Sequence, residues 1–169
     1  MQLDPTPRPD GFIRVAAALT AKQHAYAPLW LDVPARSSQE AADALGVSLG
    51  QIAKSVVFRR KADGQAVLVI TSGDRRVDEK KLKDITGTLG RADADYVKAR
   101  TGFSIGGVSP LGFAPANGAV DPLLFLDREL FRFDVIWAAA GHPNGVFEVT
   151  PAELVALTGA PVLDVVQEA

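Results

Sequence analysis

The sequence predicts a single α+β domain with a mixed, mostly antiparallel sheet and flanking helices. The chain has 169 residues and a hydrophobic fraction of 47%, enough to bury one substantial core. Its helical and strand-like segments interleave irregularly instead of alternating strictly, which is typical of α+β architecture. A doubly wound nucleotide-binding fold is the less favoured alternative. We expect residues 11–169 to form the domain and the proline-rich residues 1–10 to form a flexible tail.

The first elements are predicted from apolar spacing and capping residues. Phe12, Val15 and Leu19 recur at helical spacing, which predicts a helix over 11–24 and then a short strand over 28–33. The segment Ser37-Ser38-Gln39-Glu40 is a capping box, so a second helix begins there and ends at Gly46.

Two β-rich runs, 52–60 and 65–71, are joined by the turn signal Lys61-Ala62-Asp63-Gly64 and predict a hairpin. Because side chains alternate along a strand, Ile52, Lys54, Val56 and Phe58 share one face, on which the lysine is the exception. Three further helices are predicted at 78–85, 92–100 and 151–158, and they are closed by Gly87, Gly102 and Gly159. Residues 102–118 are expected to form a structured loop around a short strand. Further strands are predicted at 123–126, 135–139, 146–149 and 161–166, with a turn at 141–145.

Composition excludes several classes of protein. The absence of cysteine removes disulfides, thiolate nucleophiles and cysteine-bound zinc. A formal net charge of −2 gives no general attraction for nucleic acid, so any RNA contact must be local and transient. Neither a secretory signal nor a membrane-length apolar run is present, and we expect a cytoplasmic protein.

Lys54 must either extend to water or be retained for binding. The hairpin register places it near Thr71 and Ser72, ahead of Arg75 and Arg76, with Lys80 on the following helix. These cations would form a rim that could hold phosphates, although charged runs are most often only solvated faces.

The segment Gly106-Gly107-Val108-Ser109-Pro110 is a second candidate, since paired glycines let a backbone approach a ligand and leave amides free to donate. A β-bulge or tight turn is the structural alternative. The segment is not a P-loop and not a Gly-x-Ser-x-Gly elbow. His142, in the 141–145 turn, is the third candidate; with only His24 besides it, a histidine-based metal site is not expected, and spacing gives no support to a triad with Ser109.

Three ordered motifs carry a family resemblance: Ile-Ala-Lys-Ser-Val-Val-Phe at 52–58, Gly-Gly-Val-Ser-Pro-Leu-Gly at 106–112, and Ala-Ala-Gly-His at 139–142, continued by Thr-Pro-Ala-Glu-Leu at 150–154. The chain resembles the YbaK/ProX family, free-standing relatives of the editing domain of bacterial prolyl-tRNA synthetases. The resemblance implies that fold and hydrolysis, in trans, of an amino acid wrongly esterified to tRNA, without a metal or cofactor. It implies catalytic roles for Lys54 and His142, substrate binding by Ser55, Gly106, Gly107, Ser109, Pro110 and Gly141, and tRNA binding by Arg75, Arg76 and Lys80.

The same resemblance bears on substrate and partners. Cysteine-directed relatives carry a serine where this chain has Ala139 and lack a histidine at the next matching site, so cysteine is disfavoured. A small amino acid on tRNA for proline is expected, and alanine, serine, threonine or a small non-protein amino acid remain open. The expected partners are the mischarged tRNA 3′ end, bound transiently, and prolyl-tRNA synthetase. The alternatives are a non-catalytic module that binds tRNA ends or a synthetase and, with least support, a serine hydrolase that uses Ser109.

Overall fold

The computed structural model describes residues 7–168, and the first six residues of the predicted tail lie outside them. The helices are α1 (Asp10–Ala21), α2 (Ser38–Leu45), α3 (Glu79–Thr86), α4 (Ala94–Thr101) and α5 (Pro151–Thr158), with 3-10 turns η1 (Leu49–Gln51), η2 (Ala116–Gly118) and η3 (Arg128–Arg132). The strands are β1 (Leu29–Trp30), β2 (Ile52–Arg60), β3 (Ala66–Ser72), β4 (Leu89–Arg91), β5 (Leu123–Asp127), β6 (Ile136–Ala139), β7 (Gly145–Val149) and β8 (Val162–Leu163).

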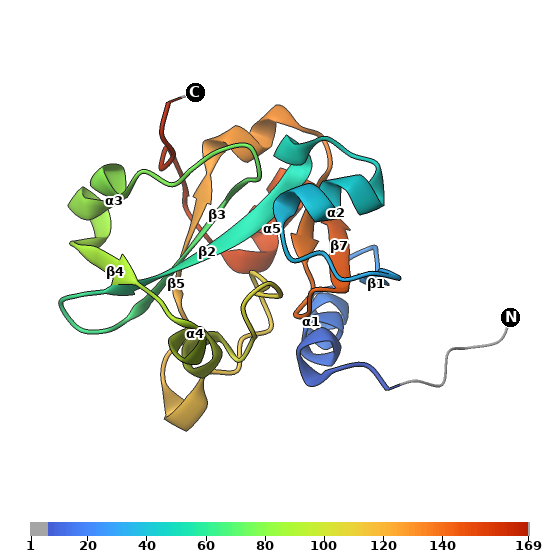
Figure 1. Cartoon of the computed structure of the whole chain (residues 1–169), viewed down its shortest axis with the longest axis horizontal. Coiled ribbons are helices and arrows are strands. Elements are labelled where there is room, and N and C mark those ends of the chain that lie inside the picture. Colours follow the sequence, from blue (N-terminus) through green and yellow to red (C-terminus); the bar gives the residue numbers. More distant parts are fainter. Residues whose placement is uncertain (1–6, 169) are drawn as a thin grey trace, which may run out of the picture.

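One mixed sheet runs through the molecule in the order β1-β7-β6-β2-β3-β5-β8, with β4 added beside β2. The pairs β1–β7, β6–β7, β2–β3 and β2–β4 are antiparallel, whereas β2–β6, β3–β5 and β5–β8 are parallel. Figure 1 shows α3 and α4 toward one end of this sheet and α1 and α2 toward the other. The predicted α+β class, with a mixed and mostly antiparallel sheet, is confirmed.

The helix ends follow the capping signals of the sequence. The Ser37 side chain accepts the Glu40 amide at the start of α2, and Gly46 ends that helix in the left-handed conformation. At α5, Thr150 and Glu153 form the reciprocal capping box.

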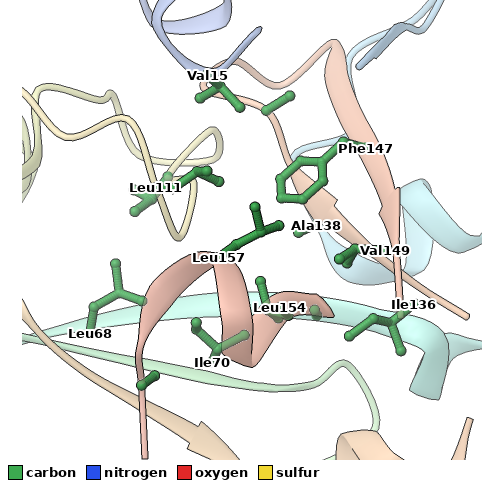
Figure 2. Packing of buried hydrophobic residues seen from close by; sticks show 14 of the residues in the cluster. Val15, Leu68, Ile70, Leu111, Ile136, Ala138, Phe147, Val149, Leu154 and Leu157 are labelled. Carbon is green, nitrogen blue, oxygen red and sulfur yellow. The ribbon is translucent and has the colours of Figure 1, made fainter. Parts of the chain in front are cut away.

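The main core lies between one face of the sheet and the helices α1 and α5. Leu154 and Leu157 of α5 point into a cluster that contains Leu68 and Ile70 of β3 and Phe147 of β7, as Figure 2 shows. Val15 of α1 and Leu111 of the 102–118 loop close the same cluster. The opposite face of the sheet packs against α2 near Ile52 and against α3 near Val69. Since both faces are covered, the strands that position the site are held rigidly.

Three predictions about local structure were wrong. Residues 102–118 contain no strand, because Pro110 and Pro115 lack the amide that a ladder needs and Gly107 bonds back to Ser104 in a turn. The strand predicted over 28–33 is limited to the two residues of β1, and the closing strand over 161–166 to Val162–Leu163 followed by a single bridge at Val166.

Candidate functional site

The candidate site lies at an interruption in the pairing of β2. Strand β3 occupies one edge of β2, while the other edge pairs with β6 only at Ile52 and Ala53 and with β4 only at 58–60. Residues 54–57 therefore have no strand neighbour on that edge within the described residues. At the Lys54–Ser55 end of this gap opens a cavity of about 310 Å³, lined by Ala35, Arg36, Ser37, Ser38, Ala41, Ile52, Ala53, Lys54, Ser55, Gly106, Val108, Trp137, Ala138, Ala139, His142, Pro143, Gly145 and Val146.

Lys54 reaches the cavity from the face of the sheet that α2 covers. Its cross-strand partner is Thr71, so the register expected for the hairpin is confirmed. The Lys54 ammonium forms no hydrogen bond or ion pair with any residue that the structure describes. Burial and then the positive charge of Arg76 lower the pKa of Lys54, and Asp74 opposes them. The side chain is therefore a partly desolvated cation that has no ion pair with a described residue, and its charge is available to a ligand.

His142 lines the cavity from the turn between β6 and β7. Its Nδ1 accepts the backbone N–H of Asn144 at 3.1 Å, and its ring stacks on Trp30 with centroids 4.9 Å apart. Burial and then the charge of Arg36 lower the pKa of His142 from its usual 6.5. The imidazole is therefore neutral at neutral pH, and with Nδ1 accepting, its proton is on Nε2.

The glycine-rich loop packs directly against the His142 turn. Gly106 has a φ of +94°, which favours glycine, and lies at the cavity beside Arg36 and Pro143. A Cβ atom at Gly107 would lie only 2.6 Å from the Cα of His142. Gly107 is needed for this close backbone approach and not for an unusual φ.

Ser109 and Pro110 are buried and do not line the cavity. The Ser109 side chain has no solvent exposure, and its Oγ lies 3.5 Å from the Leu111 amide. This placement supports a role for Ser109 in shaping the loop. It does not support a role as an exposed nucleophile.

We expect Ser109→Ala to leave ester hydrolysis within about twofold of wild type, because the lost hydroxyl makes one long hydrogen bond inside the loop. Initial rates on a mischarged tRNA and on a simple aryl ester would check this. A loss of more than tenfold, with unchanged melting temperature, would revive the serine-hydrolase reading.

Ser55 and Gly141 flank the same cavity in different ways. Ser55 lines it, and its Oγ is buried without a hydrogen-bond partner among the described residues. Gly141 does not line it; with a φ of +82° it lets the turn lie against the backbone of Gly11 on α1. Gly141 thus fixes the path of the turn that carries His142.

The three cations predicted to bind tRNA lie outside the cavity. Arg75 pairs with Asp74 at 3.3 Å, and Asp74 also pairs with Arg132 at 2.8 Å. Arg76 is exposed and close enough to affect the Lys54 pKa, while Lys80 is exposed on the first turn of α3. The positive charge of this rim is therefore partly neutralised by Asp74. Of the three cations, Arg76 is the one whose charge lowers the pKa of Lys54.

Sequence reasoning missed Arg36 and Trp30. Arg36 is exposed, lines the cavity and makes no ion pair with a described residue. The sequence offered little reason to select Arg36, since a single arginine before a helix cap forms no distinguishing pattern. Trp30 is only partly buried and stacks on His142, a contact between residues far apart in the sequence.

Within residues 7–168, no three His, Asp or Glu side chains are grouped so that they could hold a metal ion. Among the same residues, no helix combines the length and apolarity that crossing a bilayer requires.

Comparison with known proteins places this geometry in a family. The model of the aminoacyl-tRNA editing domain matches residues 32–157, which include every residue that lines the cavity. The chain belongs to the aminoacyl-tRNA editing domain family. It is thus an enzyme of the aminoacyl-tRNA deacylase class, which hydrolyses the ester of a mischarged tRNA, and the predicted family resemblance is confirmed.

Individual relatives cover most of the chain. The uncharacterised protein YwhH of Bacillus subtilis is 40% identical over 117 residues, 69% of this chain and 71% of YwhH. EbsC of Enterococcus faecalis, a candidate Cys-tRNA(Pro)/Cys-tRNA(Cys) deacylase, is 29% identical over 72% of each chain. The crystal structure of a candidate trans-editing enzyme for prolyl tRNA synthetase is 36% identical, with a TM-score of 0.83, and the match covers 99% of this chain and 100% of that chain.

Proposed function

We propose that this editing domain acts in trans on tRNA for proline and removes a small amino acid, alanine, serine or threonine, from its 3′ end. The observation that carries the proposal is the cavity beside residues 54–57, where the unpaired Lys54, the neutral His142 and the Gly106 backbone converge. Its volume is at the lower end for small-molecule sites, which suits an aminoacyl group better than a larger side chain.

The lining of the cavity divides into an apolar part and a polar part. Ala53, Val108 and Ala138 supply small apolar walls, against which a short aliphatic side chain could pack. Lys54 and Arg36 supply positive charge without anionic partners, and this charge suits the phosphate next to the terminal adenosine. The proposed tRNA contacts of Arg76 and Lys80 would extend this charge outside the cavity.

The reaction adds water across the ester and releases the free amino acid and the 3′-hydroxyl of tRNA. Negative charge develops on the carbonyl oxygen as water adds, so a fixed cation and aligned N–H donors lower the barrier. In our proposal the Lys54 ammonium orients the substrate and stabilises this charge, and His142 donates from Nε2. An aminoacyl ester is already reactive, so positioning can suffice without a protein nucleophile.

The amino acid removed is tested with tRNA for proline charged separately with alanine, serine, threonine, cysteine and proline. We expect multiple turnovers on at least one of the first three and none on proline. Cysteine is included because EbsC is named for that substrate. Hydrolysis of the cysteine ester alone would show that cysteine is the amino acid removed. Binding of these tRNAs without turnover of any of them would favour the non-catalytic module.

The pH dependence follows from the two shifted groups. Because the pKa of His142 is below 6.5, its neutral form persists on acidification, and activity should fall only below that pH. Because the pKa of Lys54 is below 10.5, its charge and the activity should be lost earlier on alkalinisation than for an ordinary lysine. Rates of ester loss, corrected for the buffer reaction at each pH, would check both limbs. An acid limb centred above pH 6.5 would contradict the role of neutral His142.

A further inference from the structure

The His142 turn is held by a segment of the chain that precedes the family match at residue 32. Two hydrogen bonds join the turn to Leu31: its N–H donates to the Asn144 carbonyl at 2.6 Å, and its carbonyl accepts the Asn144 side-chain amide at 2.8 Å. These bonds extend the β1–β7 pairing and fix β1 beside the turn.

Trp30, the last residue of β1, contacts two rings and one guanidinium group. Its indole stacks on His142 at 4.9 Å with planes 27° apart, and Phe12 of α1 meets it edge-on at 5.2 Å. The guanidinium of Arg8 lies 4.5 Å from the Trp30 ring centroid. An aromatic ring with partners of this kind has little freedom to rotate.

Helix α1 also contacts the turn directly. Gly11 and Gly141 are in backbone contact, and a Cβ atom at Gly145 would lie 2.7 Å from the Phe12 ring. Both ends of the turn are thus closed by α1, while Trp30 lies against the imidazole in its middle. The Asn144 N–H fixes Nδ1, so the orientation of the whole imidazole is determined by its contacts within the protein.

We propose that Trp30 is a positioning residue for His142, whose imidazole it holds in the orientation that the reaction needs. This inference rests on the proposed function for the role of His142 but concerns a different residue. Helix α1 and β1, outside the family match, are then part of the catalytic apparatus through Phe12 and Trp30. A misplacement of about 1 Å can lower the rate of a reaction about 100-fold, even when the substituted residue does not touch the substrate.

A double-mutant cycle tests whether Trp30 acts through His142. We expect Trp30→Ala to lower kcat on the best mischarged tRNA about tenfold, and Trp30→Phe, which keeps a stacking ring, to stay within about twofold. In a His142→Ala background, Trp30→Ala should change kcat less than twofold. Equal losses in both backgrounds, or full activity in His142→Ala, would overturn the inference. Assays are run below the melting temperature of each variant, and Tyr26→Ala serves as an aromatic-deletion control.

A second measurement does not depend on turnover. The chain has two histidines, so the imidazole Cε1–H signals in ¹H–¹³C NMR are only those of His24 and His142. We expect Trp30→Ala to shift the His142 signal and raise its pKa toward 6.5 as water enters, with Arg36 the charged group facing it. Tyr26 is an edge-on neighbour of His24 at 6.2 Å, so Tyr26→Ala should shift only the His24 signal.

An unchanged His142 signal in Trp30→Ala would overturn the positioning role even if the protein hydrolyses every substrate tested. Conversely, if the wild-type protein shows no turnover but Trp30→Ala still shifts the His142 signal, the proposed function is excluded while the contact between the two rings is established.

Discussion

Lys54→Met is expected to lower kcat/KM for the mischarged tRNA by roughly 10²–10³-fold, the range seen when one preorganised charge-stabilising donor is lost. Methionine keeps the length and packing of the lysine stem and removes only the charge. In the structure this charge has no anionic partner, so its loss leaves no other described residue unpaired.

The same substitution should make the protein more stable. The pKa of Lys54 is lower in the folded state than in the unfolded chain. At neutral pH, keeping Lys54 protonated therefore destabilises the folded state. Removing the charge should therefore raise the free energy of unfolding by a small amount, because solvent screens a half-exposed side chain and limits the cost of its charge. The gain should shrink as the pH rises toward 10.5.

Steady-state kinetics and urea unfolding on one preparation would check both effects. Lys81→Met is the matched control, because Lys81 pairs with Asp164 at 3.0 Å away from the cavity. It should retain activity and gain no stability. A Lys54→Met protein that is fully active would exclude Lys54 from the reaction, whatever its stability.

Gly107→Ala is expected to lower both the stability and the activity of the protein strongly. The added methyl group would lie 2.6 Å from the Cα and 2.7 Å from the backbone nitrogen of His142, and backbone atoms cannot move aside as a flexible side chain can. We expect a loss of about 1–3 kcal/mol in the free energy of unfolding, typical of an overpacked site. Displacement of the His142 turn should also lower kcat about tenfold or more.

Gly90→Ala is the control for this clash. Its nearest contact would be the Cε of Lys61 at 3.2 Å, the flexible end of a side chain, and its φ is also outside the left-handed region. Melting temperatures and single-turnover rates of both variants would be compared. If Gly107→Ala behaves like Gly90→Ala, the close packing of the loop on the His142 turn is not needed for function.

Local signals in the sequence predicted much of this fold. Ser37, Gly46 and Thr150 mark helix ends because caps depend on neighbouring residues, and the hairpin turn placed Lys54 opposite Thr71. By contrast, β4 at Leu89–Arg91 was missed, because a three-residue strand with a glycine at its centre forms only when a partner edge is available.

The site depended more strongly on contacts between distant residues. The sequence indicated Lys54, Ser55, Gly106 and His142, all of which line one cavity. It could not indicate the missing neighbour along 54–57, since that depends on where β6 and β4 end. Burial of Ser109 and stacking of Trp30 likewise arise only from tertiary packing.

The central claim is that the aminoacyl end of tRNA binds in the cavity beside residues 54–57. The most direct measurement is amide NMR during titration with 3′-amino-3′-deoxyadenosine carrying an amide-linked alanine or serine, which cannot be hydrolysed as an ester. We predict saturable shifts at Lys54, Ser55, Gly106 and His142, weakened in Lys54→Met. Shifts centred instead on the separate hollow lined by Ala25, Tyr26, Ala27, Leu29, Trp137 and Glu148, or no saturable shift near Lys54, would contradict it.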